Sequence, residues 1–206
     1  MRLFPTLVLS ALLVAGCDHG GGSPSRDFGD NDPNVVACVG DSITHGSHCI
    51  GAPYPSRLAA MSGKRVLNFG ADGAQASRGA ASIGSALAQR PGYVCILFGS
   101  NDAIMGVNPE TTRDYVRRIV VACKNNRSVP LLATPPPMNG KHELYAGDVR
   151  RVAEVIREVA SEQGVDLIDL HAAFGSDPSR YLNPEDGLHL SDAGGDLVAK
   201  KFNNRL

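Results

Sequence analysis

Short apolar runs alternate with stretches of helical spacing along most of this chain. Such continuous runs are typical of strands that are buried on both faces of a sheet. The chain contains five of them, over residues 35–40, 65–69, 93–98, 129–134 and 165–170. Between successive runs there is room for a crossover helix. This alternation predicts a doubly wound, three-layer α/β/α sandwich around a five-stranded parallel sheet.

The clearest helices are marked by their end residues as well as by their spacing. They span residues 110–125, residues 143–163 and a last segment from 191 toward 202. Asn108 and Pro109 suit the N-cap and first turn of the first helix, and Gly164 ends the second. Ser191 and Asp192 suit the cap of the third.

The first part of the chain differs from the rest in composition. Residues 1–16 combine a positive charge at Arg2 with an apolar run that is too short to span a bilayer, which is the pattern of a secretory signal peptide. The sequence VAGC at residues 14–17 resembles the bacterial lipobox, in which the leader is cut before the cysteine and that cysteine is lipidated. Residues 17–34 are rich in Gly, Asp, Ser and Pro, which predicts a flexible tether.

These features predict an extracytoplasmic, membrane-anchored lipoprotein on the periplasmic face or the cell surface. Its anchor would be Cys17, and its folded domain would cover residues 35–206. The alternative is an ordinary signal peptide, with Cys17 as a spare thiol.

Composition limits the domain count and the class of partner. A chain of 206 residues with 43% hydrophobic content supports one well-buried domain. Its 20 basic and 21 acidic residues nearly balance, and aromatic residues are only 5%, so we expect no nucleic-acid partner. Four cysteines in the domain allow three disulfide pairings, or they remain buried thiols inside strands; they are Cys38, Cys49, Cys95 and Cys123.

Polar clusters follow the apolar runs. GDSIT (residues 40–44) follows the first run, GSND (99–102) follows the third, and DGLH (186–189) precedes the last helix. Each cluster alone is an ordinary turn or helix cap. Because the carboxyl ends of parallel strands meet at one edge of a sheet, we expect all of them at that edge.

Together the clusters supply the groups needed for acyl transfer. A serine hydroxyl attacks a carbonyl only when a neutral imidazole takes its proton, and a carboxylate orients that imidazole. Ser42, His189 and Asp186 are the residues available for these roles. Asp186 and His189 are three residues apart, which places their side chains on one side of a helix-like turn. Asn101 offers an amide donor for a developing oxyanion.

These residues carry a family resemblance. Residues 40–42, 68–73, 99–102 and 186–189 resemble, in order, the four blocks of the SGNH or GDSL hydrolases, a superfamily of serine esterases and lipases with a flavodoxin-like fold. The resemblance implies Ser42 as nucleophile, His189 as base and Asp186 as its orienting carboxylate. It also implies an oxyanion hole made of the Ser42 amide, Gly73 and Asn101.

Two departures from the family pattern leave this chemistry in place. Ile43 stands where the family name has Leu, and Leu190 follows His189 where many members have Pro. The G-x-S-x-G elbow of the α/β-hydrolases is absent around Ser42, which disfavours that fold.

The sequence therefore predicts a serine esterase that acts on small-molecule or glycan esters without a cofactor or metal ion, with short acyl chains favoured. A carbohydrate O-acetylesterase, a thioesterase or lysophospholipase, and a catalytically silent glycan- or lipid-binding module are the alternatives. His45, His48 and Cys49 form a competing candidate for a zinc site, with a poor match to known ligand patterns.

Overall fold

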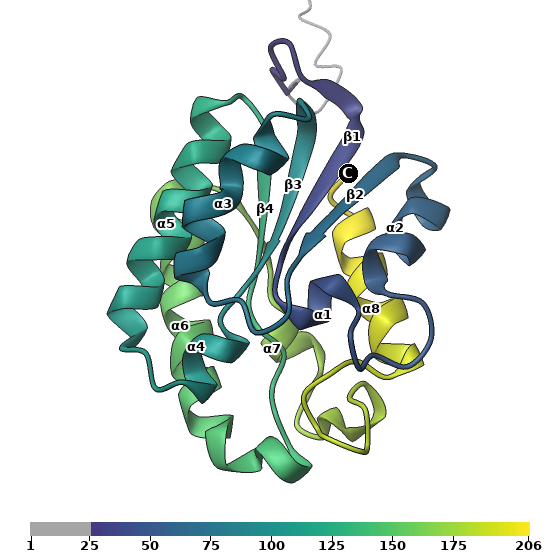
Figure 1. The fold of residues 1–206 in the computed structure, drawn as a ribbon, viewed down its shortest axis with the longest axis vertical. Coiled ribbons are helices and arrows are strands. Elements are labelled where there is room, and N and C mark those ends of the chain that lie inside the picture. The colour runs from purple at the N-terminus through teal and green to yellow at the C-terminus, as the bar shows by residue number, and fades with distance from the viewer. Residues whose placement is uncertain (1–25) are drawn as a thin grey trace, which may run out of the picture.

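Five parallel strands form the central sheet, in the order β2-β1-β3-β4-β5 (Figure 1). The computed structural model describes residues 26–206. The strands are β1 (Asp32–Gly40), β2 (Arg65–Gly70), β3 (Pro91–Leu97), β4 (Val129–Ala133) and β5 (Asp166–Ile168). The five predicted apolar runs all supply a strand.

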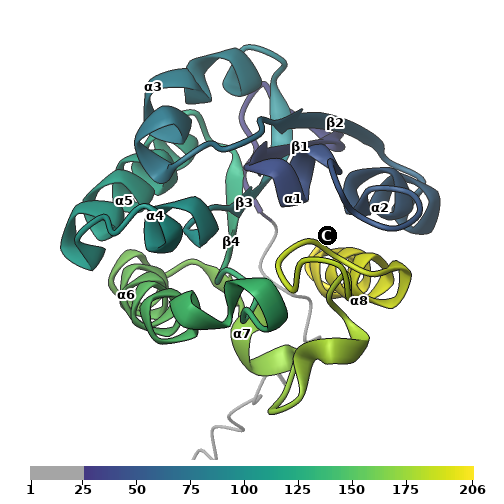
Figure 2. The same ribbon diagram turned by 60° about the horizontal axis from the view of Figure 1, so that its bottom comes forward.

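Helices cover both faces of the sheet. On one face lie α3 (Ala76–Leu87), α5 (Pro109–Asn125) and α6 (Ala146–Gln163), and on the other lie α2 (Tyr54–Ser62) and α8 (Asp192–Asn203) (Figures 1 and 2). Short helices occupy the carboxyl edge of the sheet: α1 (Ser42–His45), α4 (Ser100–Ile104) and α7 (Leu170–Ala173). The predicted doubly wound α/β/α sandwich is confirmed.

The core explains why the strands are apolar on both faces. Every residue of β3 is buried, as are the last six residues of β1, because each of these strands is covered by helices on both sides. Cys38 and Cys95 face each other in register on β1 and β3, fully buried. In the part of the chain that the structure describes, these two thiols, Cys49 and Cys123 are all free.

Three helix ends follow the sequence prediction. Asn108 accepts a hydrogen bond from the Glu110 amide at the start of α5. Ser191 accepts one from the Gly194 amide at the start of α8, and Gly164 ends α6 in the left-handed conformation.

Two predicted boundaries were wrong. The helix expected from residue 143 begins at Ala146, because the preceding residues form a tighter 3-10 turn, η1 (Gly140–Tyr145), whose His142 ring bonds the carbonyl of Asp186. The fifth strand is only three residues long. Asp169, expected within it, instead caps α7 and pairs with Arg157.

The domain also begins earlier than the sequence predicts. The tether was expected to reach residue 34, yet β1 starts at Asp32, and Phe28 packs edge-on against Tyr93 with ring centroids 5.2 Å apart. Asn31 donates a hydrogen bond of 2.6 Å to the carbonyl of Asn126. The expected signal peptide, Cys17 and the tether up to residue 25 lie outside the described residues. Within residues 26–206, no helix has the length and apolar content needed to cross a bilayer.

Candidate active site

The polar clusters meet at the carboxyl edge of the sheet, which Figure 2 turns toward the viewer. Ser42 is the first residue of α1, directly after β1, and Asn101 lies in α4, directly after β3. His189 lies in the loop between η2 (Pro178–Arg180) and α8. The parallel sheet thus brings together residues that are far apart in the sequence.

Ser42, His189 and Asp186 form a continuous chain of polar contacts. The Nε2 atom of His189 lies 3.0 Å from the hydroxyl oxygen of Ser42. On the other side of the ring, Nδ1 lies 2.7 Å from Oδ2 of Asp186. Ser42 and His189 are each only 8% exposed, so the contact between them is largely shielded from water. A shielded imidazole between a hydroxyl and a carboxylate can take up and return the hydroxyl proton.

The turn that carries Asp186 and His189 is held by its own backbone. Oδ1 of Asp186 accepts hydrogen bonds from the amides of Leu188 and His189, at 2.8 and 3.0 Å. Burial alone would raise the pKa of Asp186, but these two amides and the His189 ring together hold it below its usual range. Asp186 is therefore ionised at neutral pH, as an orienting carboxylate must be.

Gly187 is required at the centre of this turn. Its φ is +71°, a conformation that residues with a side chain rarely adopt. A Cβ there would also lie 2.0 Å from the backbone carbonyl oxygen of Asn139, a distance at which the two atoms would clash. Asn139 in turn donates its amide to the Gly187 carbonyl at 2.9 Å. The close approach of these two backbones fixes the triad turn against the segment that leads into η1.

Gly73 and Asn101 follow β2 and β3, the two strands that flank β1, Gly73 in a loop and Asn101 in α4. Gly73 has a φ of +66° and is exposed, in the loop after β2. The Asn101 side-chain amide donates to the Ala74 carbonyl at 3.2 Å. Asp102, which is 1% exposed, accepts from the Ala76 amide and from the Thr112 hydroxyl. The two side chains of α4 thus clamp the loop that carries Gly73.

Asp41 caps α1 from a fully buried position. Its Oδ1 accepts from the Ile43 amide at 2.9 Å, whereas Oδ2 has no hydrogen-bond partner within residues 26–206. Burial raises the pKa of Asp41 to about 7, and the nearby charge of Asp102 acts in the same direction. The side chain next to the candidate nucleophile is therefore a carboxyl group that gives up its proton only near neutral pH.

This raised pKa predicts a pH dependence of stability. An unfolded chain releases the Asp41 proton near its ordinary pKa of about 4, whereas the folded protein retains it up to about pH 7. The stabilisation linked to this proton is complete below about pH 4 and is lost as pH rises toward about 7. We expect the free energy of unfolding of Asp41→Asn, relative to the native protein, to increase over this window by at most on the order of 4 kcal/mol.

Urea unfolding of both proteins at about pH 4, 5, 6, 7 and 8 measures this difference in unfolding free energy across the window. The buried amide of the variant lowers its stability equally at every pH, so only the slope matters. A difference that stays constant from pH 4 to pH 8 would show that Asp41 ionises normally.

A family model of the GDSL-like lipase/acylhydrolase family matches residues 38–197, which include all of these residues. The chain belongs to this family. Membership places it among the hydrolases that act on esters.

Solved structures and a curated protein are also similar to this chain. A G-D-S-L family protein from Desulfitobacterium hafniense DCB-2 is 25% identical, with a TM-score of 0.73 over 84% of this chain and 99% of that one. An acetylxylan esterase from Geobacillus stearothermophilus is 21% identical, with a TM-score of 0.69 over 84% and 94%. The uncharacterized lipoprotein YqeF of Bacillus subtilis is 27% identical over 70% of this chain, which spans only 63% of that protein.

Several side chains that support the GDSL-type site were missed in the sequence. Asp41 and Asp102 were noticed only as part of their motifs, and nothing local shows that they are buried. Nothing near His142 in the sequence indicates that its Nδ1 lies 2.8 Å from the carbonyl oxygen of Asp186. Asn183 was not noticed at all, although it bonds the backbone of both His48 and His189. The Asn-Pro pair at residues 183–184 was the only available signal for it, as a turn marker.

The competing candidate for a metal site does not assemble. The described residues contain no group of three or more His, Cys, Asp or Glu side chains that could hold a metal ion. His45 instead bonds the Ser47 hydroxyl at 2.6 Å, and its ring lies 3.2 Å from Asp72. His48 faces the ring of His189.

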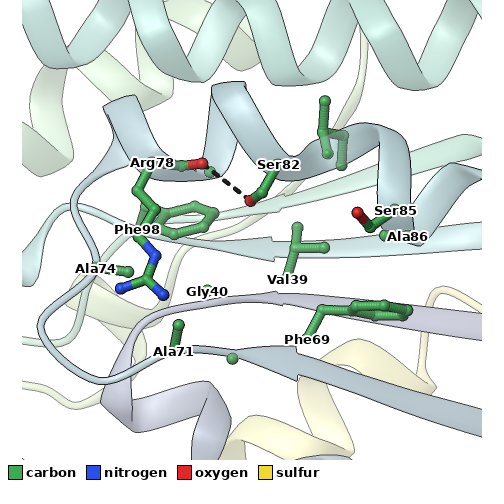
Figure 3. Close-up of a pocket in the computed structure, with 13 residues that line it drawn as sticks. Val39, Gly40, Phe69, Ala71, Ala74, Arg78, Ser82, Ser85, Ala86 and Phe98 are labelled. Atoms are coloured by element: carbon green, nitrogen blue, oxygen red, sulfur yellow. Dashed lines mark hydrogen bonds between the residues drawn. The ribbon is translucent and has the colours of Figure 1, made fainter.

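A cavity of about 280 Å³ lies beside the site, between α3 and the sheet (Figure 3). Its walls are mostly apolar, with Val39, Phe69, Ile83 and Phe98 among the lining residues. Figure 3 shows the Arg78 guanidinium at one end, reaching from α3 toward Gly40 and Ala71. Ser42 and His189 do not line this cavity.

Proposed function

We propose that the protein is a serine hydrolase that cleaves carboxylic esters through an acyl-Ser42 intermediate. The observation that carries the proposal is the pair of contacts from Asp186 to His189 and from His189 to Ser42, at 2.7 and 3.0 Å. Family membership supports ester hydrolysis, and the geometry supports these residues as its agents.

In the first half of the reaction, the Ser42 oxygen attacks the ester carbonyl carbon while Nε2 of His189 takes the serine proton. The carbonyl oxygen becomes an oxyanion, for which the amides of Ser42 and Gly73 and the Asn101 side chain are the proposed donors. When the tetrahedral intermediate collapses, the bond to the alkoxy group breaks. The leaving oxygen then receives the proton from His189 and departs as the alcohol.

In the second half, a water molecule attacks the acyl-Ser42 carbonyl and gives its proton to His189. Collapse of this intermediate releases the carboxylic acid, and Ser42 regains a proton from His189. Asp186 accepts a hydrogen bond from the Nδ1–H of His189 throughout and does not itself become protonated. This bond leaves Nε2 free to accept in the resting enzyme and stabilises the imidazolium that forms twice in each cycle.

We further propose that the preferred acyl groups are short. Of the apolar side chains that follow β3 and β4 in the chain, Met138 belongs to the buried core and Met105 is 70% exposed. Ser42 and His189 do not line the apolar cavity under α3, and the charged Arg78 side chain lies at one end of it. A long acyl tail therefore has little accessible wall to contact.

A series of p-nitrophenyl esters tests this proposal. Each further buried methylene adds about 0.8 kcal/mol of binding only while apolar wall is available. We expect acetyl to butyryl esters to have a higher kcat/KM than octanoyl or longer esters. A kcat/KM that climbs through decanoyl would contradict the proposal. Repeating the ester series with the Arg78→Ala variant would then show whether the cavity under α3 receives the acyl tail.

A carbohydrate O-acetylesterase is the second candidate for the same site. It is favoured by the structural similarity to an acetylxylan esterase, which at 21% identity is evidence of a common fold. Acetylated xylooligosaccharides and p-nitrophenyl acetate can be compared directly. A kcat/KM at least about tenfold higher for the sugar ester would favour this candidate, because that difference measures binding of the sugar in the transition state.

We also propose that Cys17 carries a lipid anchor. The lipobox-like sequence supports this, and the similar Bacillus subtilis protein is named a lipoprotein. Cys17→Ser should move the protein from the membrane fraction to the soluble fraction, because one or more acyl chains supply the membrane affinity. Ester hydrolysis should survive in the variant. A variant that still needs detergent for extraction would refute the anchor at Cys17, and Cys49→Ser serves as the matched control.

A further inference from the structure

His48 has a backbone conformation that is uncommon for residues other than glycine. Its φ is +59°, in the left-handed region that only a few per cent of non-glycine residues adopt, with asparagine, aspartate and histidine the most frequent among them. Such outliers persist only where surrounding contacts fix them, and they are concentrated at functional sites. His48 lies in the loop between α1 and α2, and its side chain is exposed, so packing in the core does not impose the conformation.

The contacts that fix His48 come from the loop that carries the candidate triad. Asn183, which is 7% exposed, donates its side-chain amide to the His48 carbonyl at 2.8 Å. Two residues later, the Ile50 amide donates to the Leu190 carbonyl at 2.9 Å. The loop of His48 is thus joined to the triad loop at the His48 carbonyl and again two residues later, at Ile50.

Asn183 also holds the triad turn itself. Its backbone amide donates to the His189 carbonyl at 2.7 Å, and its carbonyl accepts from the amides of Asp186 and Gly187. Its Oδ1 accepts from the Glu185 amide at 3.0 Å. One buried residue therefore fixes the backbone on which His189 sits and the backbone on which His48 sits.

The result of this arrangement is a pair of imidazole rings. The His48 and His189 ring centroids lie 5.1 Å apart, with the ring planes tilted by 48°. The Asp186 bond fixes one edge of the His189 ring, and the Ser42 contact lies at the other edge. The His48 ring lies beside the His189 ring, which is bonded at both of these edges.

We propose that His48 is a positioning residue, whose ring holds the His189 imidazole in line with Ser42 and whose own backbone is set by Asn183. This inference rests on the proposed function. The inference adds to the proposed function a residue outside the sequence motifs that pointed to the site.

Two substitutions separate the ring from the backbone. His48→Asn keeps a residue that tolerates the left-handed conformation and removes the ring, so its thermal stability should equal or exceed that of the native protein. His48→Phe keeps a ring of similar shape. The matched control is Arg90→Asn, since Arg90 also has a positive φ, of 52°, and lies at the amino-terminal side of β3, away from the site.

For p-nitrophenyl acetate we expect kcat of His48→Asn to fall roughly tenfold at unchanged KM, because a misoriented base slows the chemical step and leaves ground-state binding intact. Labelling of Ser42 by a fluorophosphonate should slow by the same factor. His48→Phe should recover most of the kcat, and Arg90→Asn should equal the native protein. An unchanged kcat in His48→Asn would overturn the proposal, as would a raised KM at unchanged kcat, which would make His48 a substrate contact.

Proton NMR of the His189 ring provides a readout that does not depend on turnover. The Nδ1 proton shared with Asp186 should give a low-field signal in the native protein. This signal should broaden or disappear in His48→Asn and return in His48→Phe. If the native protein hydrolysed no ester and Ser42 did not react, the proposed function would fail, and the NMR signal would still decide whether His48 orders the ring. A signal of equal width in all three proteins would overturn the positioning role.

Discussion

Ser42→Ala is expected to reduce kcat for p-nitrophenyl acetate by roughly 10⁴-fold or more, because it removes the atom to which the acyl group is transferred. The same change should prevent labelling by a fluorophosphonate. KM should change little, since the oxyanion donors and the surrounding walls remain. The methyl side chain is smaller than the hydroxymethyl group it replaces, and the His189 ring keeps its bond to Asp186. We therefore expect a folded protein with a normal thermal unfolding transition.

Ser47→Ala is the matched control, because Ser47 lies in the turn directly after α1 and its hydroxyl bonds His45. It should hydrolyse and label like the native protein. Mass spectrometry of the labelled native protein should find the phosphonyl group on the peptide that contains Ser42. Near-normal hydrolysis by Ser42→Ala, or a label on another serine, would contradict the mechanism and favour a different nucleophile.

The strands and the long helices were predictable because local chemistry decides them. The runs that became β1 and β3 are apolar without interruption, which only a sheet covered on both faces can bury. Asn108 and Ser191 are residues whose side chains bond a helix N-terminus wherever they occur, and they do so here. The fold class followed from the alternation of such elements.

The members of the candidate site were predictable for a related reason. Parallel strands bring their carboxyl ends to one edge, so polar residues placed after different strands must meet there. Ser42 and His189 are in contact there, and Asn101 lies after the neighbouring strand β3. The spacing of Asp186 and His189 also fixed their contact, because three residues in a turn bring both side chains to one side.

The support of the site was not predictable, because it depends on contacts between segments that are distant in the sequence. The Asn183 amide reaches a carbonyl 135 residues away, and nothing near either residue shows this. The tight turn of η1 and the need for Gly187 arise from the approach of Asn139. The pKa of Asp41 is likewise set by burial under elements that follow it in the chain. Local patterns specify the elements, and packing between them specifies the electrostatics.

His189→Ala and Asp186→Asn are expected to have the other large effect on hydrolysis, for two different reasons. His189→Ala removes the group that accepts the Ser42 proton, and kcat should fall by roughly 10⁴-fold or more. Asp186→Asn keeps an oxygen that can accept from the Leu188 and His189 amides, so the turn should remain folded. Its amide N–H would face Nδ1, however, and would favour the tautomer in which Nε2 carries the proton and cannot accept one from Ser42. We expect a loss of roughly 10⁴-fold, with a small residual activity.

Double variants distinguish a catalytic unit from independent contributions. If Ser42, His189 and Asp186 act together, the Ser42→Ala/His189→Ala protein should be no less active than Ser42→Ala alone, because the base has no proton to accept. His45→Ala, with an exposed imidazole that bonds Ser47, is the control and should retain normal kcat. Additive losses in the double variant would mean that Ser42 and His189 act independently. A normal kcat for Asp186→Asn would mean that His189 is oriented by its backbone alone. The short contact between Asp186 and Nδ1 argues for the unit, because the same carboxylate that fixes the turn also fixes the tautomer.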